Sequence, residues 1–126
     1  MSSTRPIKVH QTLGPGALES AYQACLAHEL RRREHRVECE VALPLEFEGV
    51  LIEVAYRIDM RIDQLVLVEN KTVEKILPIH FAQLLTYLKL SGLSLGLTIN
   101  WNVIFLRDGL QRMVRNHPEE FTAGHG

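Results

Sequence analysis

The sequence predicts a single α/β domain in which a small mixed β-sheet is flanked by helices, in the order α-β-β-β-α-β-β. Two segments, residues 17–33 and 78–90, carry apolar residues at the three- and four-residue spacing of helices. Residues 38–61 between them alternate and are rich in β-forming side chains. The apolar run at residues 64–68 indicates a buried strand that needs cover on both faces.

Length and composition favour one ordinary globular domain. The chain has 126 residues, of which 46% are hydrophobic, which suffices for one core. We place the domain at residues 1–126, with its core at about 9–114. The net charge of −1 weighs mildly against a strong duplex binder. It does not exclude nucleic acid, because the carboxylates of a metal site offset a basic binding face.

Several other classes are excluded or disfavoured. No apolar run approaches the ~20 residues of a membrane span, and the first residues lack a signal-peptide core, so we expect a cytoplasmic protein. Cys25 and Cys39 are the two cysteines, and they cannot form a four-cysteine zinc or iron–sulfur site. We expect both to be small buried residues.

The N-terminal part is predicted to hold one helix. Residues 1–10 are polar and expected to be loose, and Leu13-Gly14-Pro15-Gly16 signals a turn. The helix runs from Ala17 to about Arg33, and its basic end suits a helix C-terminus.

A three-stranded meander is expected next. The strands span Glu38–Phe47, Val50–Arg61 and Leu65–Lys71, with a hairpin turn at Glu48-Gly49. Alternation along the second strand predicts one face formed by Tyr56, Ile58, Met60 and Ile62 and another formed by Arg57, Asp59 and Arg61.

The second helix and two further strands complete the fold. Pro78 suits the first turn of a helix that runs to about Leu90 and stops near Ser91-Gly92. Leu95–Trp101 and Val103–Arg107 are the last two strand candidates, joined at Asn102. The polar tail after about Val114 is expected to be frayed.

The third strand ends in chemistry-bearing residues. The apolar run leads into Glu69 and Lys71, which share a face because strand side chains alternate, while Asn70 points the other way. Asp59 lies ten residues before Glu69, across a hairpin. A two-residue turn would put the two carboxylates on opposite faces, whereas a three-residue loop or one bulge would pair them within ~5 Å at Cβ. Two carboxylates this close repel unless a divalent cation lies between them, so we predict an odd loop or a bulge.

A structural interpretation of the same residues stays open. Asp59 could pair with Arg57 or Arg61 on a solvated face, and Glu69 with Lys71 could form a surface ion pair.

Two helical positions add to the candidate site. His80, Gln83 and Tyr87 lie at spacings of three and four, which gives a polar-aromatic stripe that could orient a phosphate, a base or water. The alternative is a half-buried Tyr87 ring and a surface His80 with satisfied hydrogen bonds. Glu19 in the first turn of the first helix either complements the helix dipole or supplies a third carboxylate.

These residues fall into four blocks that resemble the GxxExxY proteins of the PD-(D/E)XK nuclease superfamily. The blocks are Gly16-Ala17-Leu18-Glu19-Ser20-Ala21-Tyr22 with the preceding Leu13–Gly16 turn, Tyr56-Arg57-Ile58-Asp59, Glu69-Asn70-Lys71, and Pro78 to Leu88 with Gln83 and Tyr87. The resemblance covers roughly Val9 to Val114. It implies a restriction-endonuclease-like core.

The resemblance also implies roles for individual residues. Asp59 and Glu69 would bind Mg²⁺ or Mn²⁺ with the Asn70 backbone carbonyl, and Glu19 would reach the metal directly or through water. Lys71 would position the attacking water and offset transition-state charge. Gln83 with Tyr87 looks like the Q-x-x-x-Y element of RecB-type exonucleases, which helps to hold DNA. Tyr22, His80 and Arg57 complete the expected substrate-binding set.

The chain departs from the pattern at three places. The helix that usually precedes Leu-Gly-Pro-Gly is shortened to a few residues, Arg33-Glu34-His35-Arg36 lacks the usual glycine, and position 70 is Asn where an apolar residue is usual. We expect a metal-dependent nuclease acting on DNA in repair, processing or defence, with water attacking phosphorus in line.

Two rival functions stay open. One is a catalytically weak module that binds nucleic acid or protein, and the other is a subunit of a homodimer or repair complex. The second would show an exposed apolar patch around Trp101 and Phe105.

Overall fold

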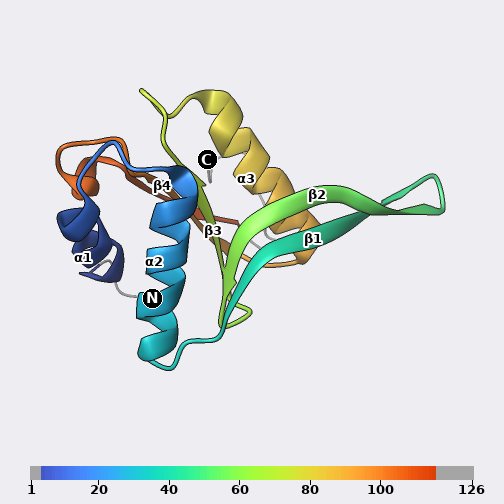
Figure 1. Cartoon of the computed structure of the whole chain (residues 1–126). Helices are drawn as coiled ribbons and strands as arrows, with labels where there is room; N and C mark the ends of the chain where they lie inside the picture. The colour runs from blue at the N-terminus through green and yellow to red at the C-terminus, as the bar shows by residue number, and fades with distance from the viewer. Residues whose placement is uncertain (1–3, 116–126) are drawn as a thin grey trace.

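The computed structural model describes residues 4–115, in which three α-helices and one 3₁₀ helix pack on a five-stranded mixed sheet. The helices are α1 (Thr4–Leu13), α2 (Glu19–Arg32), α3 (Pro78–Ser91) and η1 (Leu106–Asp108), and the strands are β1 (Val37–Phe47), β2 (Val50–Ile62), β3 (Val66–Lys71), β4 (Leu95–Asn100) and β5 (Leu110–Val114). The sheet order is β1-β2-β3-β4-β5, and the β3–β4 pair is parallel while the others are antiparallel. Figure 1 shows α1 and α2 on one side of the sheet and α3 on the other, which confirms the predicted mixed α/β class.

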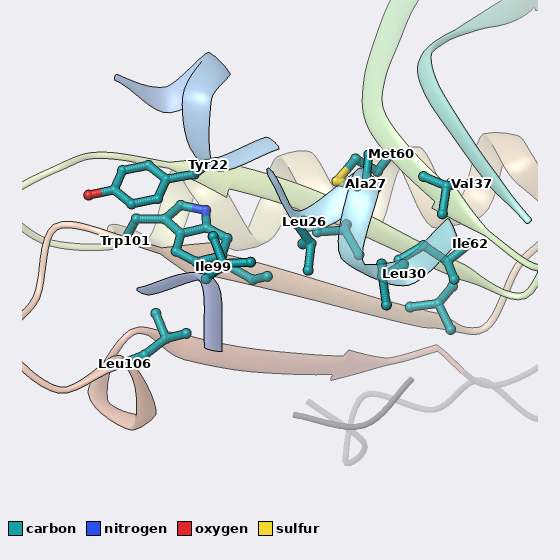
Figure 2. Close-up of a cluster of buried hydrophobic side chains, with 13 residues drawn as sticks. Tyr22, Leu26, Ala27, Leu30, Val37, Met60, Ile62, Ile99, Trp101 and Leu106 are labelled. Carbon is teal, nitrogen blue, oxygen red and sulfur yellow. The ribbon is translucent and has the colours of Figure 1, made fainter. Parts of the chain in front are cut away.

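Two apolar clusters hold the layers together. The larger one joins α2 to one face of the sheet, and Figure 2 shows the Tyr22 ring lying against Trp101 within it. The smaller one joins α3 to the other face through Leu67, Leu84 and Leu88. Gly96 permits the close approach of α3, because a Cβ there would lie 2.9 Å from Leu84. Both faces of β3 are therefore covered, as its apolar sequence requires.

The hairpin between β2 and β3 has the predicted odd loop. Ile62 pairs with Val66 and Met60 with Val68, so residues 63–65 form a three-residue loop. Asp63 fixes this loop, since its carboxylate accepts from the Arg36 amide at 2.8 Å and lies 2.7 Å from the His35 ring. Continued by one residue, this register sets Asp59 opposite Glu69.

The predicted faces of β2 need a correction. Met60 and Ile62 belong to the cluster under α2, whereas Ile58 belongs to the cluster under α3. The change falls at Asp59, opposite Glu40 in β1, whose φ of 55° lies in the left-handed region. The ladder registers Cys39 with Met60 and Val41 with Ile58 around this point, so the distortion is local.

The N-terminal residues form a helix where the sequence predicted a loose segment. Contacts with α2 stabilise α1. Glu29 on α2 is buried, and its Oε1 forms ion pairs with Arg5 at 3.5 Å and with Lys8 at 3.2 Å. His10 Nε2 lies 2.8 Å from the Val103 carbonyl oxygen. The helix before the Gly14 turn is therefore ten residues long rather than shortened to a few.

The last strand was predicted too early in the chain. Residues 103–105 form a loop that leads into η1, which includes residues 106 and 107, and β5 begins at Leu110. Gly109 sets this path, because its carbonyl accepts from the Asn100 amide and a Cβ there would lie 2.1 Å from the Asn100 oxygen. Trp101 is fully buried, so the expected exposed patch around Trp101 and Phe105 is reduced to Phe105 and its neighbour Ile104.

The remaining, smaller expectations differ in their outcomes. Cys25 is exposed, which corrects the expectation that both cysteines are buried. Glu34, in the loop that lacks the usual glycine, adopts the left-handed conformation that glycine favours, with φ of 68°. The tail after Val114 lies almost entirely outside the described residues. Within the described part of the chain, no helix is long and apolar enough to cross a membrane.

Candidate metal centre

The carboxylates of Asp59 and Glu69 each accept a hydrogen bond from a backbone amide of the other strand, at the point where β2 and β3 separate. The Asp59 amide donates to Glu69 Oε1 at 3.1 Å, and the Asn70 amide donates to Asp59 Oδ2 at 2.7 Å. The two carboxylates thus replace ladder hydrogen bonds beyond the last registered pair, Met60 with Val68. In each carboxylate, one oxygen accepts the backbone hydrogen bond that orients the group. The second oxygen is left for a ligand.

Burial raises the pKa of both carboxyl groups. Glu69 is 6% exposed, and burial followed by the charge of Asp59 raises its pKa to about 7. Burial also raises the pKa of Asp59, although the hydrogen bond from the Asn70 amide opposes this. The folded chain therefore holds two carboxylates in a place where their ionised forms are disfavoured.

The Asn70 carbonyl faces the same gap. Within a strand, the N–H and C=O of one residue point to the same neighbouring strand, and the next residue points to the other. The Lys71 carbonyl accepts from the Trp101 amide on the β4 side, whereas the Asn70 amide points to Asp59 on the β2 side. The Asn70 carbonyl is consequently directed toward β2, where the ladder has already ended.

These donors fit a hard divalent cation. Mg²⁺ and Mn²⁺ prefer carboxylate and carbonyl oxygens, and a cation between Asp59 and Glu69 would offset their mutual repulsion. No group of three His, Cys, Asp or Glu side chains is gathered tightly enough to hold a metal ion by itself in the part of the chain that the structure describes. The Asp59 and Glu69 carboxylates and the Asn70 carbonyl are oxygen atoms of the kind that such a cation prefers.

Glu19 and a further acid share a cleft with Asp59. The cleft has a volume of about 710 Å³, lies between α2 and the β1–β2 hairpin, and is lined by Glu19, Gln23, Glu40 and Asp59 among others. Burial and then the charge of Asp59 raise the pKa of Glu19. Glu40 was not singled out in the sequence, because a glutamate in a strand gives no signal until its register with Asp59 is known.

The three residues of the predicted polar-aromatic stripe on α3, His80, Gln83 and Tyr87, have different surroundings in the structure. Tyr87 is half-buried, and burial followed by the charges of Glu69 and Asp59 raises its pKa. Its ring meets Tyr56 edge-on with centroids 5.7 Å apart. His80 instead caps the start of α3, since its Nδ1 accepts from the Leu77 amide at 2.9 Å. Gln83 is exposed one turn before Tyr87.

Two expected substrate-binding residues have structural contacts. Tyr22 is fully buried, and its hydroxyl donates to the Gly14 carbonyl and accepts from the Ala17 amide. Contact of Tyr22 with a substrate does not fit this placement; the residue holds the turn before α2. Arg57 is exposed, and its guanidinium donates to the Glu40 carbonyl at 3.3 Å.

The ion-pair alternative does not describe this geometry. Arg61 forms a two-point pair with Glu38, with the shorter contact at 2.7 Å, so it does not neutralise Asp59. Glu69 is buried rather than on the surface, and within residues 4–115 no carboxylate oxygen lies within 4.0 Å of Lys71 Nζ. In the described chain, neither carboxylate of the gap is therefore neutralised by a close ion pair.

Comparison with known proteins agrees with this geometry. Residues 4–113 match the PD-(D/E)XK nuclease superfamily. No significant match was found among curated proteins or among solved structures. The match extends over most of the 126 residues and contains all of the site residues described above. The chain belongs to the PD-(D/E)XK nuclease superfamily.

Proposed function

We propose that this protein is a Mg²⁺- or Mn²⁺-dependent nuclease that hydrolyses phosphodiester bonds in DNA, in repair, processing or defence. The observation that carries the proposal is the pair of cross-strand hydrogen bonds that Glu69 accepts from the Asp59 amide and Asp59 accepts from the Asn70 amide, with Lys71 at the same strand end. Within the superfamily, the Gly16-Ala17-Leu18-Glu19-Ser20-Ala21-Tyr22 segment supports assignment to the GxxExxY proteins.

The carboxylates would hold the cation together with the Asn70 carbonyl. When bound, the cation supplies Lewis acidity to the phosphate and lowers the pKa of water. Asp59 and Glu69 serve this role because their orientation is already fixed by the amides of Asn70 and Asp59. Glu19 extends the acidic lining of the same cleft.

Lys71 would act on the phosphate rather than on the carboxylates. Its ammonium charge reaches Glu69 and Asp59 electrostatically without a close ion pair in the described chain. Such a cation can position attacking water and offset the charge that develops on the phosphoryl oxygens. Water adds to phosphorus, the bond to the leaving sugar oxygen breaks, and that oxygen takes up a proton. Gln83, Tyr87 and Arg57 would hold the strand beside the reacting phosphate.

The test is a cleavage assay on DNA with Mg²⁺, Mn²⁺ or chelator. Wild type is compared with Lys71→Ala and Asp59→Ala, with circular dichroism to confirm folding. The proposal expects metal-dependent cleavage by wild type that both variants lose. Equal rates for all three proteins would mean that the assigned residues do not carry the reaction.

A second candidate function is a protein-binding module that keeps the nuclease fold. The observation that favours it is the distal part of the β1–β2 hairpin, which extends away from the helices in Figure 1. Phe47, Val50 and Leu51 are exposed there, and residues 44–56 contain three glutamates and no lysine or arginine. Such an arm suits an apolar, basic protein surface better than DNA. Folded wild type without cleavage under any metal condition would favour this candidate.

A further inference from the structure

A network of polar side chains adjoins the candidate metal centre on the α2 side of β3, the face to which the Asn70 side chain points, and its members Gln23 and Glu40 line the same cleft as Asp59. Trp101 Nε1 donates to Asn70 Oδ1 at 3.0 Å, and Asn70 Nδ2 donates to Gln23 Oε1 at 3.2 Å. Gln23 Nε2 in turn donates to Glu40 Oε2 at 3.0 Å. The contacts connect β3, α2, β1 and the residue that directly follows β4.

The chemistry of the two terminal groups, the Trp101 indole and the Glu40 carboxylate, fixes which atom donates in every hydrogen bond of the network. An indole nitrogen can only donate and an ionised carboxylate can only accept. Trp101 therefore requires the oxygen of the Asn70 amide, which turns the Asn70 nitrogen toward Gln23. Glu40 requires the nitrogen of the Gln23 amide, which turns its oxygen toward Asn70. The two requirements agree, so each amide has a single satisfied orientation.

The central residue of this polar network, Asn70, lies in the protein interior. Asn70 is fully buried, its Nδ2 also contacts Met60 Sδ at 3.3 Å, and its own amide is held by Asp59 at 2.7 Å. Trp101 is fixed in turn by stacking on Tyr22, with ring centroids 4.7 Å apart and planes 8° apart. Figure 2 shows the two rings lying against each other. The backbone amide and the side chain of Asn70, whose carbonyl faces the cation gap, are thereby both fixed by hydrogen bonds.

Gln23 also connects Asn70 to the helix that carries Glu19. Residues four apart on a helix lie on one face, so Gln23 and Glu19 lie one above the other on α2. Both line the same cleft as Asp59. The position of α2 relative to the end of β3 is therefore set, at the level of the site, by the hydrogen bond between Gln23 and Asn70.

We propose that Gln23 and the side chain of Asn70 are positioning residues of the metal centre, which lock the Glu19 helix to the Asn70 carbonyl, with Glu40 as the acceptor that orients Gln23. The inference rests on the proposed function, because it concerns the same centre. Partners of this kind typically change metal affinity 10- to 100-fold when lost, so an effect of about tenfold is expected.

Exchanging the donor and the acceptor tests the proposal. Gln23→Glu keeps an acceptor for Asn70 but replaces the donor to Glu40 by a carboxylate, which repels the Glu40 carboxylate. Charge alone would strengthen Mn²⁺ binding in this variant, whereas loss of positioning weakens it. The double variant Gln23→Glu/Glu40→Gln restores a donor and an acceptor with unchanged net charge. Calorimetric titration with Mn²⁺ should show affinity about tenfold weaker in the single variant and within about twofold of wild type in the double variant.

The matched control is Gln11→Glu, the same charge change on the exposed face of α1. This control should leave the Mn²⁺ affinity within about twofold of wild type, because Gln11 takes no part in the hydrogen bonds that join Trp101, Asn70, Gln23 and Glu40. Urea unfolding of each variant separates stability from affinity. A merely structural role would lower the free energy of unfolding and leave the affinity of the folded protein unchanged.

Trp101 gives a second readout that needs no activity. It is the one tryptophan of the sequence, so its indole N–H is a single resolvable NMR signal. Mg²⁺ should shift this signal in wild type, and Asn70→Leu should speed its hydrogen exchange and abolish the Mg²⁺-induced shift. A wild type that binds Mn²⁺ as tightly as Gln23→Glu does would overturn this inference alone. A wild type that binds neither ion would overturn the proposed function and this inference together.

Discussion

The two faces of the strand end at Glu69, Asn70 and Lys71 are built in opposite ways. On the α2 face, each polar group of the Asn70 side chain is bonded, to Trp101, Gln23 and Met60. On the other face, burial raises the pKa of Glu69 to about 7, and in the described chain Lys71 has no carboxylate within 4.0 Å. One face fixes the backbone, and the other keeps charged groups available for a ligand. The contrast indicates that the rigidity of the first face serves the second.

Removing charge from the ligand face should have the largest effect. Lys71→Ala should lower the cleavage rate by about 10²–10³, the usual effect of removing one group that stabilises transition-state charge. The free energy of unfolding should change little, because Lys71 makes no close ion pair in the described residues. Lys89→Ala, at an exposed position of α3, is the matched control and should cleave at the wild-type rate. A similar fall in both variants would show that general charge, rather than the strand end, controls the reaction.

Breaking the opposite face should lower stability in addition to weakening metal affinity. Asn70→Ala leaves the Trp101 indole N–H buried without an acceptor, so the free energy of unfolding should fall by about 1–3 kcal/mol. Asn102→Ala removes an exposed amide with one long contact of 3.4 Å and should cost less than about 0.5 kcal/mol. Chemical denaturation monitored by circular dichroism measures both. Equal stability of the two variants would contradict the account of Asn70 as a buried anchor.

Proton uptake should distinguish the ligand face in the metal-free protein. The folded pKa of Glu69, about 7, lies above its ordinary value of 4.5, so folding is favoured by the bound proton. This contribution is complete below pH 4.5 and is lost as the pH rises through about 7. With chelator present, the free energy of unfolding should therefore decline between pH 5 and 8, and the decline should be smaller in Glu69→Gln. An identical pH dependence in that variant would remove Glu69 as its source.

The smallest effect is expected at the edge of the ligand face. Tyr87→Phe keeps the edge-on contact with Tyr56 but removes the hydroxyl, whose pKa is raised by burial and by the charges of Glu69 and Asp59. One lost hydrogen bond to substrate, about 0.5–1.5 kcal/mol, should weaken DNA affinity about 2- to 10-fold with little change in stability. Fluorescence anisotropy with labelled DNA and Ca²⁺ in place of Mg²⁺ measures this. A larger effect on unfolding than on DNA binding would assign Tyr87 to the core.

The ligand face was largely predictable from the sequence, because its chemistry constrains the register. Asp59 and Glu69 can share a cation only across an odd hairpin loop, and the loop at residues 63–65 is odd. The identities of Glu69 and Lys71 as neighbours on one face follow from strand alternation alone. Their roles in catalysis stay predictions.

The supporting face could not be predicted, because its contacts are distant in sequence. Asn70 lies 47 residues from Gln23 and 31 from Trp101, and no periodic pattern connects them. The same limit explains the missed α1, whose polar residues form a helix through ion pairs with the distant Glu29. The β-forming residues 103–107 were mistaken for a strand because the close approach of Gly109 to Asn100 was not visible in the sequence.

The central claim is that Asp59 and Glu69 together hold one divalent cation for cleavage. Calorimetric titration of Mn²⁺ into wild type and Glu69→Ala at pH 8 tests it most directly. The account predicts one site per chain in wild type and loss of that site in a folded Glu69→Ala protein. Mn²⁺ binding of equal affinity and stoichiometry in both proteins would contradict it.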